Sequence, residues 1–171
     1  MFIIGVTWEG SEVVVELRLA TVADAEDIGR FQTRSWDQTY RGTVPDAYLD
    51  ATAWQLRASR WHSRIVGDRV VWLARHRGDV VGVASTASTD VARGDLPALE
   101  LASIYVDASQ HGSGLAAELL EAAIGDAPAH LWVFTSNLRA QRFYAKHRFV
   151  ATDEHQSDPD TGLGETRWVR R

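Results

Sequence analysis

The sequence predicts a single α/β domain in which a mixed sheet carries helices on its faces. Three observations support this class. The chain has 171 residues, a length that ordinarily folds around one hydrophobic core. Its composition, 45% hydrophobic and 24% charged, is typical of a globular protein. Apolar patterns of strand and helix type follow one another in the order β-α-α-β-β-β-α-β-α-β-β.

A short extension and the first strand open the chain. Residues 1–12 are interpreted as an extension before a domain that spans 13–171, because a Gly-Ser turn signal ends the extension. The first strand of the domain is expected over 13–19. Thr21 precedes Asp24 by three residues, the spacing of a capping box, in which a hydroxyl and a carboxylate satisfy free N–H groups at the start of a helix.

Two helices separated by a bend are expected next. The first helix runs to about Trp36. Gly42 and Pro45 then interrupt the helical periodicity, which predicts a bend over 36–45. The second helix is expected over 50–65, because apolar residues recur there at helical spacing. These residues are Trp54, Ala58, Trp61 and Ile65.

Strands and helices alternate in the rest of the chain. Two β-rich runs, 70–76 and 80–88, are joined by a hairpin turn at 77–79. A third run, 99–106, leads through a glycine-rich turn into a helix with an apolar face. The remaining expected elements are a strand over 130–135, a helix over 137–147, and strands near 149–152 and 166–169.

Composition excludes several classes of function. The chain has no cysteine, which excludes disulfides, thiolate metal sites and an acyl-cysteine intermediate. Its six histidines never adopt a metal-ligand spacing, so no metal is expected. A net charge of -5 gives no electrostatic footprint for nucleic acid or anionic lipid. Neither a membrane-spanning run nor a secretory signal is recognisable, so we expect a cytoplasmic protein without nucleic-acid or membrane partners.

The glycine-rich turn is the densest chemical signal. Gly112 and Gly114 let the backbone approach a ligand closely, and the N–H groups of the following helix point at that ligand, for which phosphate is the natural choice. The letters also match the dinucleotide fingerprint G-x-G-x-x-A. However, five residues separate Gly112 from the strand, and no acidic residue follows the next strand for a ribose. A turn that merely connects a strand to a helix is the structural alternative.

The turn resembles the pyrophosphate loop of the GCN5-related N-acetyltransferase (GNAT) family, whose pattern is Arg or Gln, two variable residues, Gly, one variable residue, and Gly or Ala. Further segments resemble the same family in the right order and cover about residues 13–170. They are Leu17-Arg18-Leu19-Ala20-Thr21, Trp36 with Tyr40-Arg41-Gly42, Glu100-Leu101 with Ile104-Tyr105-Val106-Asp107, and Asn137-Leu138-Arg139-Ala140 with Phe143-Tyr144-Ala145-Lys146. The resemblance implies a mostly antiparallel sheet flanked by helices. Two departures are His111, in place of Arg or Gln, and Arg148, in place of Gly.

The resemblance implies direct transfer of an acetyl group from acetyl-CoA to a primary amine of a small molecule or peptide. Tyr144 matches the family's tyrosine that protonates the CoA sulfur; the alternative is packing in the core. Glu100 matches a carboxylate that often serves as base, with a solvent-facing charge as its alternative. The cofactor-contacting positions carried over are Ile104, Tyr105, Val106, His111, Gly112, Ser113, Gly114, Leu115, Ala116, Asn137, Ala140 and Phe143.

Trp36, Tyr40 and Trp54 are the expected acceptor-side residues, because the first two helices border the acceptor cleft in the resembling family. Helical spacing favours burial of Trp54 in the core instead. A homodimer is possible, since dimers are common in the family. The alternative functions are a CoA-binding sensor or interaction module with little catalysis, and transfer of a longer acyl group.

Overall fold

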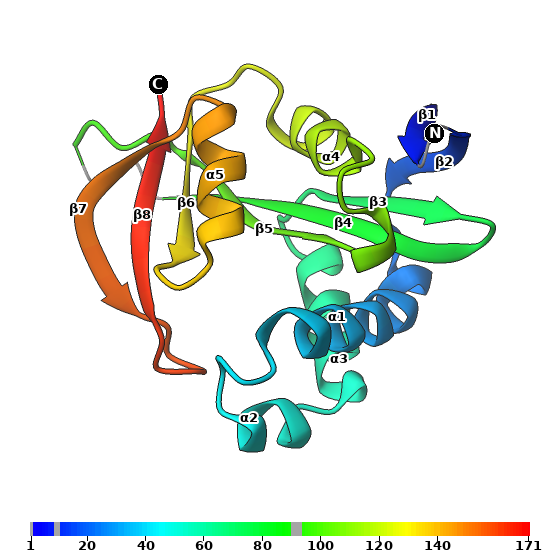
Figure 1. The fold of residues 1–171 in the computed structure, drawn as a ribbon, viewed down its shortest axis with the longest axis horizontal. Helices are drawn as coiled ribbons and strands as arrows, with labels where there is room; N and C mark the ends of the chain where they lie inside the picture. The colour runs from blue at the N-terminus through cyan, green and yellow to red at the C-terminus, as the bar shows by residue number, and fades with distance from the viewer. Residues whose placement is uncertain (1, 9–10, 90–93) are drawn as a thin grey trace.

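The computed structural model describes residues 2–8, 11–89 and 94–171. Within them an eight-stranded sheet has the order β1-β2-β3-β4-β5-β6-β8-β7 and carries helices on both faces (Figure 1). The strands are β1 (Phe2–Trp8), β2 (Ser11–Leu19), β3 (Val71–His76), β4 (Asp79–Ser88), β5 (Leu99–Val106), β6 (Ala129–Phe134), β7 (Val150–Ser157) and β8 (Gly164–Arg170). The helices are α1 (Ala25–Tyr40), α2 (Asp46–Ala51), α3 (Trp54–Val66), α4 (Leu115–Ile124) and α5 (Leu138–Lys146), with short 3-10 turns at Val22–Asp24 and Ala108–Gln110.

Neighbouring strands in this sheet are antiparallel except for β5 and β6, which are parallel. A parallel pair needs a crossover connection, and here α4 supplies it. The predicted mixed, mostly antiparallel sheet flanked by helices is confirmed. The register of the parallel pair is recorded only at Glu100 and His130, near the start of both strands. Beyond that point β5 and β6 diverge (Figure 1).

The start of α1 follows from the predicted capping box, which is present between Thr21 and Asp24. The Thr21 N–H donates to the Asp24 carboxylate over 2.8 Å. Arg18 binds the same carboxylate through both terminal nitrogens, at 2.8 and 2.7 Å, and Arg75 adds a third contact at 3.0 Å. Hydrogen bonding from Arg18 is the main cause of a pKa of Asp24 well below its usual range. One buried carboxylate therefore joins β2, β3 and the start of the helix.

Several boundaries differ from the expectation, among them the end of the strand expected near 149–152, which runs to Ser157 as β7. Helix α1 continues past Trp36 to Tyr40, because both side chains pack on Phe134 of β6. The helix predicted over 50–65 is two helices, α2 and α3, separated at residues 52–53. Residues 1–12, interpreted as an extension, contribute β1, which pairs along its length with β2; positions 1, 9 and 10 lie outside the described residues.

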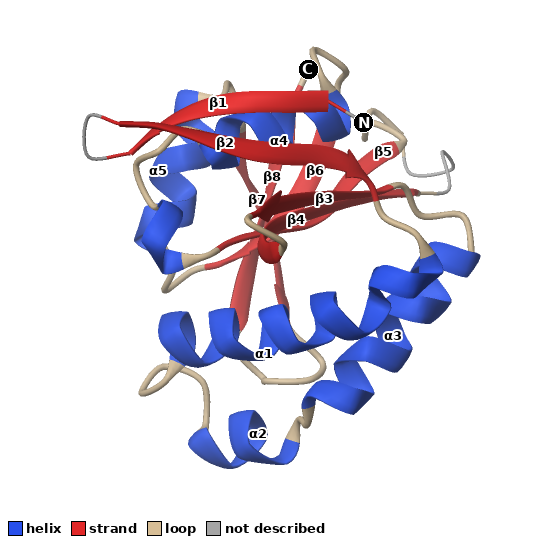
Figure 2. Ribbon diagram, turned by 90° about the vertical axis from the view of Figure 1, so that its right-hand side faces the viewer, coloured by secondary structure: helices blue, strands red, loops and turns tan. Residues whose placement is uncertain are grey.

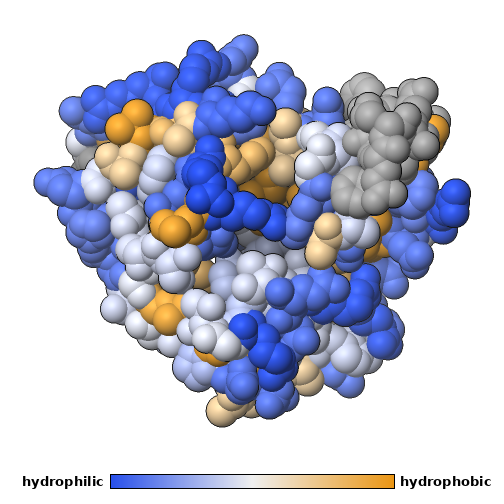
Figure 3. Space-filling model, in the orientation of Figure 1, coloured by the Kyte–Doolittle hydropathy of each residue, from blue (hydrophilic) through white to orange (hydrophobic). Residues whose placement is uncertain are grey.

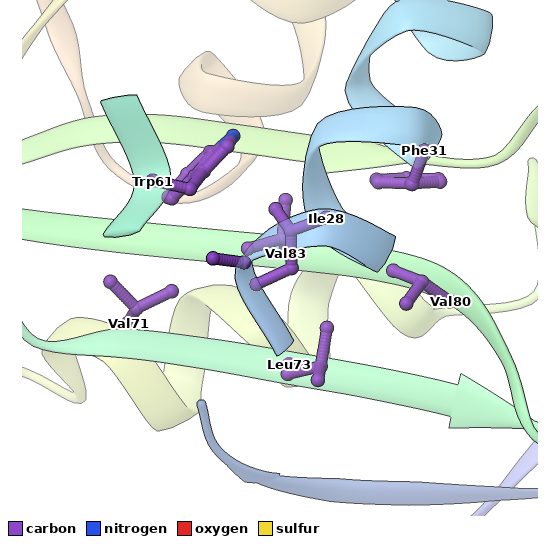
Figure 4. Close-up of a cluster of buried hydrophobic side chains, with 8 residues drawn as sticks. Ile28, Phe31, Trp61, Val71, Leu73, Val80 and Val83 are labelled. Atoms are coloured by element: carbon purple, nitrogen blue, oxygen red, sulfur yellow. The ribbon is translucent and has the colours of Figure 1, made fainter. Parts of the chain in front are cut away.

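Helices α1, α2 and α3 lie together below the edge-on sheet in Figure 2, whereas α4 and α5 lie above it. The lower core joins Ile28 and Phe31 of α1 and Trp61 of α3 to β3 and β4 (Figure 4). The indole N–H of Trp61 donates to Gln32 over 2.8 Å, which satisfies the one polar atom that this ring brings into the core. This packing fixes α1 and α3 beside the edge where β5 and β6 separate.

Candidate active site

A cavity of about 770 Å³ lies among β5, the glycine-rich turn, and the facing parts of α1 and α5. Figure 3 shows a hollow near the middle of the molecule, with apolar surface on its upper side. Most of the predicted site residues line this cavity. They are Tyr40, Ile104, Tyr105, Val106, His111, Gly112, Gly114, Ala116, Asn137, Ala140, Phe143 and Tyr144. Residues from four separate parts of the sequence thus meet at one site.

The glycine-rich turn has the backbone of an anion-binding loop. Gly112 and Gly114 have φ values of 86° and 95°, in the left-handed region that favours glycine. The buried Ser113 hydroxyl donates to the Gln110 carbonyl over 2.8 Å and accepts from the Leu115 N–H over 3.2 Å, which braces the turn. No partner within the described part of the chain takes up the N–H groups of Gly112 and Gly114. They remain available to an anion at the start of α4.

Arg139 reaches the glycine-rich turn from the first turn of α5. Its Nη1 lies 2.6 Å from Nδ1 of His111. Burial, and then the charge of Arg139, lowers the pKa of His111, which keeps the imidazole neutral and able to accept this hydrogen bond. In the sequence, Arg139 belongs to the Asn137-Leu138-Arg139-Ala140 segment, which predicts no role for this side chain. A permanent cation therefore stands beside the position where a histidine replaces the usual Arg or Gln.

Asn137 connects α5 to α1 across the cavity. Its Oδ1 accepts the Ala140 N–H over 3.0 Å and caps the helix. Its Nδ2 donates to the Tyr40 hydroxyl over 3.1 Å. Burial raises the pKa of Tyr40 to about 12, so this phenol stays protonated in neutral solution. Both polar atoms of the Asn137 amide are therefore engaged in contacts that hold α5 and α1 in place.

The Tyr144 side chain is buried, with 7% of its surface exposed, and its ring packs against Phe143 and Phe149. It also lines the cavity. Its hydroxyl makes no hydrogen bond to any residue that the structure describes. Burial raises the pKa of Tyr144, which keeps the phenol protonated. Tyr144 therefore belongs both to the core and to the cavity wall, and its phenol keeps a proton that no described residue binds.

Several predicted residues lie outside the cavity wall. Ser113 and Leu115 are buried and do not line the cavity. Trp36 packs behind Tyr40, with ring centres 5.0 Å apart. Glu100 lies at the far end of β5, next to His130. Trp54 lies under the guanidinium of Arg30 at 3.6 Å, away from the cavity.

One face of α1 was not predicted as part of the site. Three residues on this face line the cavity: Ser35, Gln38 and Thr39. The sequence predicted a bend over 36–45, so the helix was expected to end before this face was complete. Glu165 of β8 was not predicted either; it lies opposite Phe134 and accepts a hydrogen bond from Gln156 over 2.8 Å. Burial raises the pKa of Glu165. This second carboxylate lies on the sheet face that carries the aromatic side chains of the site.

The described residues contain no group of three or more His, Asp or Glu side chains placed to hold a metal ion. No helix in the same ranges has the length and apolar character needed to cross a bilayer.

Comparisons with known proteins agree with this geometry. The family model described as "Acetyltransferase (GNAT) family" matches residues 31–149. Uncharacterized N-acetyltransferases of Mycobacterium bovis and Mycobacterium tuberculosis are 38% identical over 87 residues, which are 47% of this chain and 53% of theirs. The chain thus matches only about half the length of these curated relatives.

Solved structures share the fold. The PaiA N-acetyltransferase of Thermoplasma acidophilum, in complex with coenzyme A, has a TM-score of 0.68 at 16% identity, covering 92% of this chain and 98% of that one. YncA of Salmonella typhimurium, a putative acetyltransferase with acetyl-CoA, has a TM-score of 0.67 at 20% identity, covering 92% and 93%. At such identities the likeness concerns the fold alone.

Proposed function

Because the chain belongs to the GNAT family of acetyltransferases, we propose that it transfers an acetyl group from acetyl-CoA to a primary amine of a small molecule or peptide. One observation carries the proposal. A single cavity joins unengaged backbone N–H groups at Gly112 and Gly114 to the unengaged hydroxyl of Tyr144. The first feature suits a pyrophosphate, and the second suits a leaving thiolate that needs a proton.

Three parts of the cavity fit acetyl-CoA. The glycine-rich turn would bind the pyrophosphate through backbone N–H groups, with Arg139 adding a charge. The backbone of Ile104 to Val106 lies past the point where β5 leaves β6, so it can pair with the amides of the pantetheine arm as an added strand would. Phe143 and Ala140 supply apolar surface beside it. Acetyl-CoA itself supplies a thioester carbonyl and a thiolate leaving group.

The chain's own groups would then manage two protons. As the amine nitrogen bonds to the carbonyl carbon, the C–S bond breaks and the Tyr144 hydroxyl gives its proton to the departing sulfur. The amine gives up a proton to a base. Glu100 is the base predicted from the sequence; its place outside the cavity wall means that it would act through water. Glu165, which also lies outside the cavity wall, is a second candidate, since burial raises its pKa toward the range suited to a base.

The absence of cysteine supports direct attack by the amine in a ternary complex rather than an acyl-cysteine route. A CoA-binding module without turnover, and transfer of a longer acyl chain, are the alternative outcomes of the assay. The homodimer and the cytoplasmic location stay predictions from the sequence.

Replacement of Tyr144 by phenylalanine tests the proposal. We expect Tyr144→Phe to lower turnover by about 10- to 100-fold, because the departing thiolate loses its proton donor while the ring still fills the core. Thiol release from acetyl-CoA over a panel of amines measures the rate, and calorimetry measures CoA affinity, which should change little.

Tyr48→Phe is the matched control, since it removes a phenol hydroxyl outside the cavity wall. Full activity in Tyr144→Phe would refute the role of Tyr144 as acid. Binding of CoA without thiol release on any amine would instead favour the binding module.

A further inference from the structure

Arg57, in the first half of α3, is a buried cation that has no counter-ion among the residues that the structure describes. Only 3% of its surface is exposed. No carboxylate or carbonyl of the described residues pairs with it, and its Nε is enclosed without any hydrogen-bond partner. Burial lowers the pKa of the guanidinium, the expected response of a charge removed from water. Such an arrangement destabilises a fold unless something else binds the charge.

The other buried arginines of the described chain are engaged. Arg167 donates through Nε to Glu154 over 2.8 Å. Arg170 donates to the carbonyls of Gly125 and Ala127, at 2.6 and 2.8 Å. This fold therefore provides acceptors where an arginine serves the structure alone. Arg57 is the exception among the three.

Arg57 lies behind the wall of the cavity formed by α1. Its guanidinium carbon is 5.0 Å from the centre of the Trp36 ring, a cation–π distance that fixes the plane of the group. Trp36 packs on Tyr40, which lines the cavity. Tyr105 also lines the cavity and packs against the same aromatic cluster. Arg57 itself does not line the cavity. It lies behind Trp36, on the α1 side of the cavity, and the glycine-rich turn and α5 form other parts of the wall.

Within the guanidinium, Nε is fully enclosed, whereas the two terminal nitrogens are not among the fully enclosed atoms without a partner, so they keep a small exposed surface through which an anion could be bound. Two turns further along α3, Arg64 stacks at 4.8 Å over the Trp61 ring and has no ion pair within the described ranges. Arg60, between them, is already paired with Asp160 at 3.0 Å. The face of α3 toward Tyr105 thus carries two uncompensated cations.

We propose that the acceptor amine also carries an oxyanion, a carboxylate or phosphonate, and that Arg57 binds this group during acetyl transfer. The inference rests on the proposed acetyltransferase function. The planar guanidinium can give two parallel hydrogen bonds to an oxyanion, which orients the acceptor as well as holding it. An acceptor without the anion would leave Arg57 buried and unpaired, so neutral analogues are disfavoured.

Matched acceptors test this proposal. Methionine, phenylalanine and glutamate would each be compared with the corresponding α-amide, and 2-aminoethylphosphonate with ethylamine, by thiol release from acetyl-CoA. We expect Arg57→Met to lower kcat/KM for the anionic member of a pair by about 10- to 100-fold relative to the neutral member. Because wild type and variant act on the same pair, the different basicity of the two amines cancels.

Two further variants separate recognition from folding. Arg60→Met is the control, because Arg60 lies on the same helix but already forms an ion pair with Asp160. In this variant the preference for the anionic acceptor should stay as in wild type. Arg57→Lys keeps the positive charge but lacks the planar guanidinium with its two parallel donors. Its preference for the anionic acceptor should therefore lie between those of wild type and Arg57→Met. Arg57→Met should keep or raise the melting temperature, because an apolar side chain replaces an unpaired buried charge. A large fall in melting temperature with an unchanged acceptor preference in Arg57→Lys would assign Arg57 to the structure and overturn the proposal.

Failure of acetyl transfer itself is distinguishable. If no amine releases thiol with any variant, the proposed function fails. Binding at the anion site is then measured as the change in melting temperature caused by N-acetyl-phenylalanine or by its amide, in the presence of CoA. Stabilisation of wild type, but not of Arg57→Met, by the acid alone supports the site. Equal effects of acid and amide on both proteins refute it.

Discussion

His111 and Arg139 show how a long-range contact can change the meaning of a residue in a motif. The histidine replaces a cation at the glycine-rich turn, and its lowered pKa leaves it neutral at pH 7. The guanidinium 2.6 Å away restores a positive charge at the same place. The charge that the motif normally carries on the loop is supplied here from α5, so the two residues act as one anion-binding unit in the proposed site.

We therefore expect Arg139→Gln to weaken CoA binding by about 10-fold or more, because charge-assisted hydrogen bonds to phosphate are among the stronger polar contacts. Calorimetry at fixed salt measures this. Binding should also take up a proton, since an adjacent pyrophosphate would raise the pKa of His111, so affinity should increase as the pH falls from 7 toward 6.

Arg142→Gln is the control for Arg139, because Arg142 is exposed one turn further along α5. Proton uptake is read from the dependence of binding heat on the buffer's ionisation enthalpy, and His111→Gln should abolish it. Unchanged affinity in Arg139→Gln would contradict the assignment of its charge to the cosubstrate.

Residues whose role depends on local backbone could be predicted from the sequence. Gly112, Gly114 and Asn137 are such cases, since a positive φ or a helix cap is encoded within a few residues. Arg139 and Arg57 are different. The role of Arg139 depends on its contact with His111, 28 positions away in the sequence. The proposed role of Arg57 depends on the lack of an ion-pair partner among the described residues, which a sequence pattern does not reveal.

At the scale of elements, the crossing of α1 and α3 sets the acceptor-side wall. A Cβ added to Gly29 of α1 would lie 2.6 Å from the backbone nitrogen of Ala58 and 2.8 Å from its Cα. Only glycine lets the two backbones approach so closely. Trp36 on α1 and Arg57 on α3 meet beyond this contact, so the crossing also determines how these two side chains stack.

Gly29→Ala should destabilise the protein by about 1–3 kcal/mol, because overpacking against backbone outweighs the higher helix propensity of alanine. Urea unfolding measures this free energy. The variant should also lose kcat/KM for the acceptor more than affinity for CoA, since β5, α4 and α5 form the cosubstrate side. Arg34→Ala, exposed on the same helix, should stay within about 0.5 kcal/mol of wild type. A stabilised Gly29→Ala would show that the helices separate without loss.

Element type was more predictable than element length. Periodicity placed every strand from β2 onward and the main helices near their observed positions, because both elements bury one face. The end of α1 was wrong because its last turn is held by packing on Phe134, nearly a hundred residues later. Gly42 and Pro45 indicate that the helix must end nearby, but they fix the position of the bend only to within a few residues.

At the scale of the whole molecule, His130 lies where the two parts of the sheet join. It is the β6 member of the recorded register pair between β5 and β6, and it also pairs with Val169 of β8. The side chain is 1% exposed, and its Nε2 lies 3.0 Å from the Thr89 hydroxyl. Burial, and then the charge of Arg167, lowers the pKa of His130 to about 4. The folded protein therefore keeps this imidazole neutral in mildly acidic solution.

The unfolded chain protonates the same imidazole near pH 6.5, so between about pH 6.5 and 4 only the unfolded state binds the proton. The free energy of unfolding must then fall as the pH falls through this window, by roughly 3 kcal/mol in total from this group. Urea unfolding from pH 7.5 to 4.5 measures the slope. His130→Gln should flatten it, whereas His62→Gln, exposed on α3, should not. If His130→Gln keeps the wild-type slope, the acid sensitivity arises elsewhere than at the junction of β5 and β6. If the slope flattens, protonation of His130 at that junction is a cause of the loss of stability in acid, and the sheet that carries both walls of the cavity depends on a neutral imidazole there.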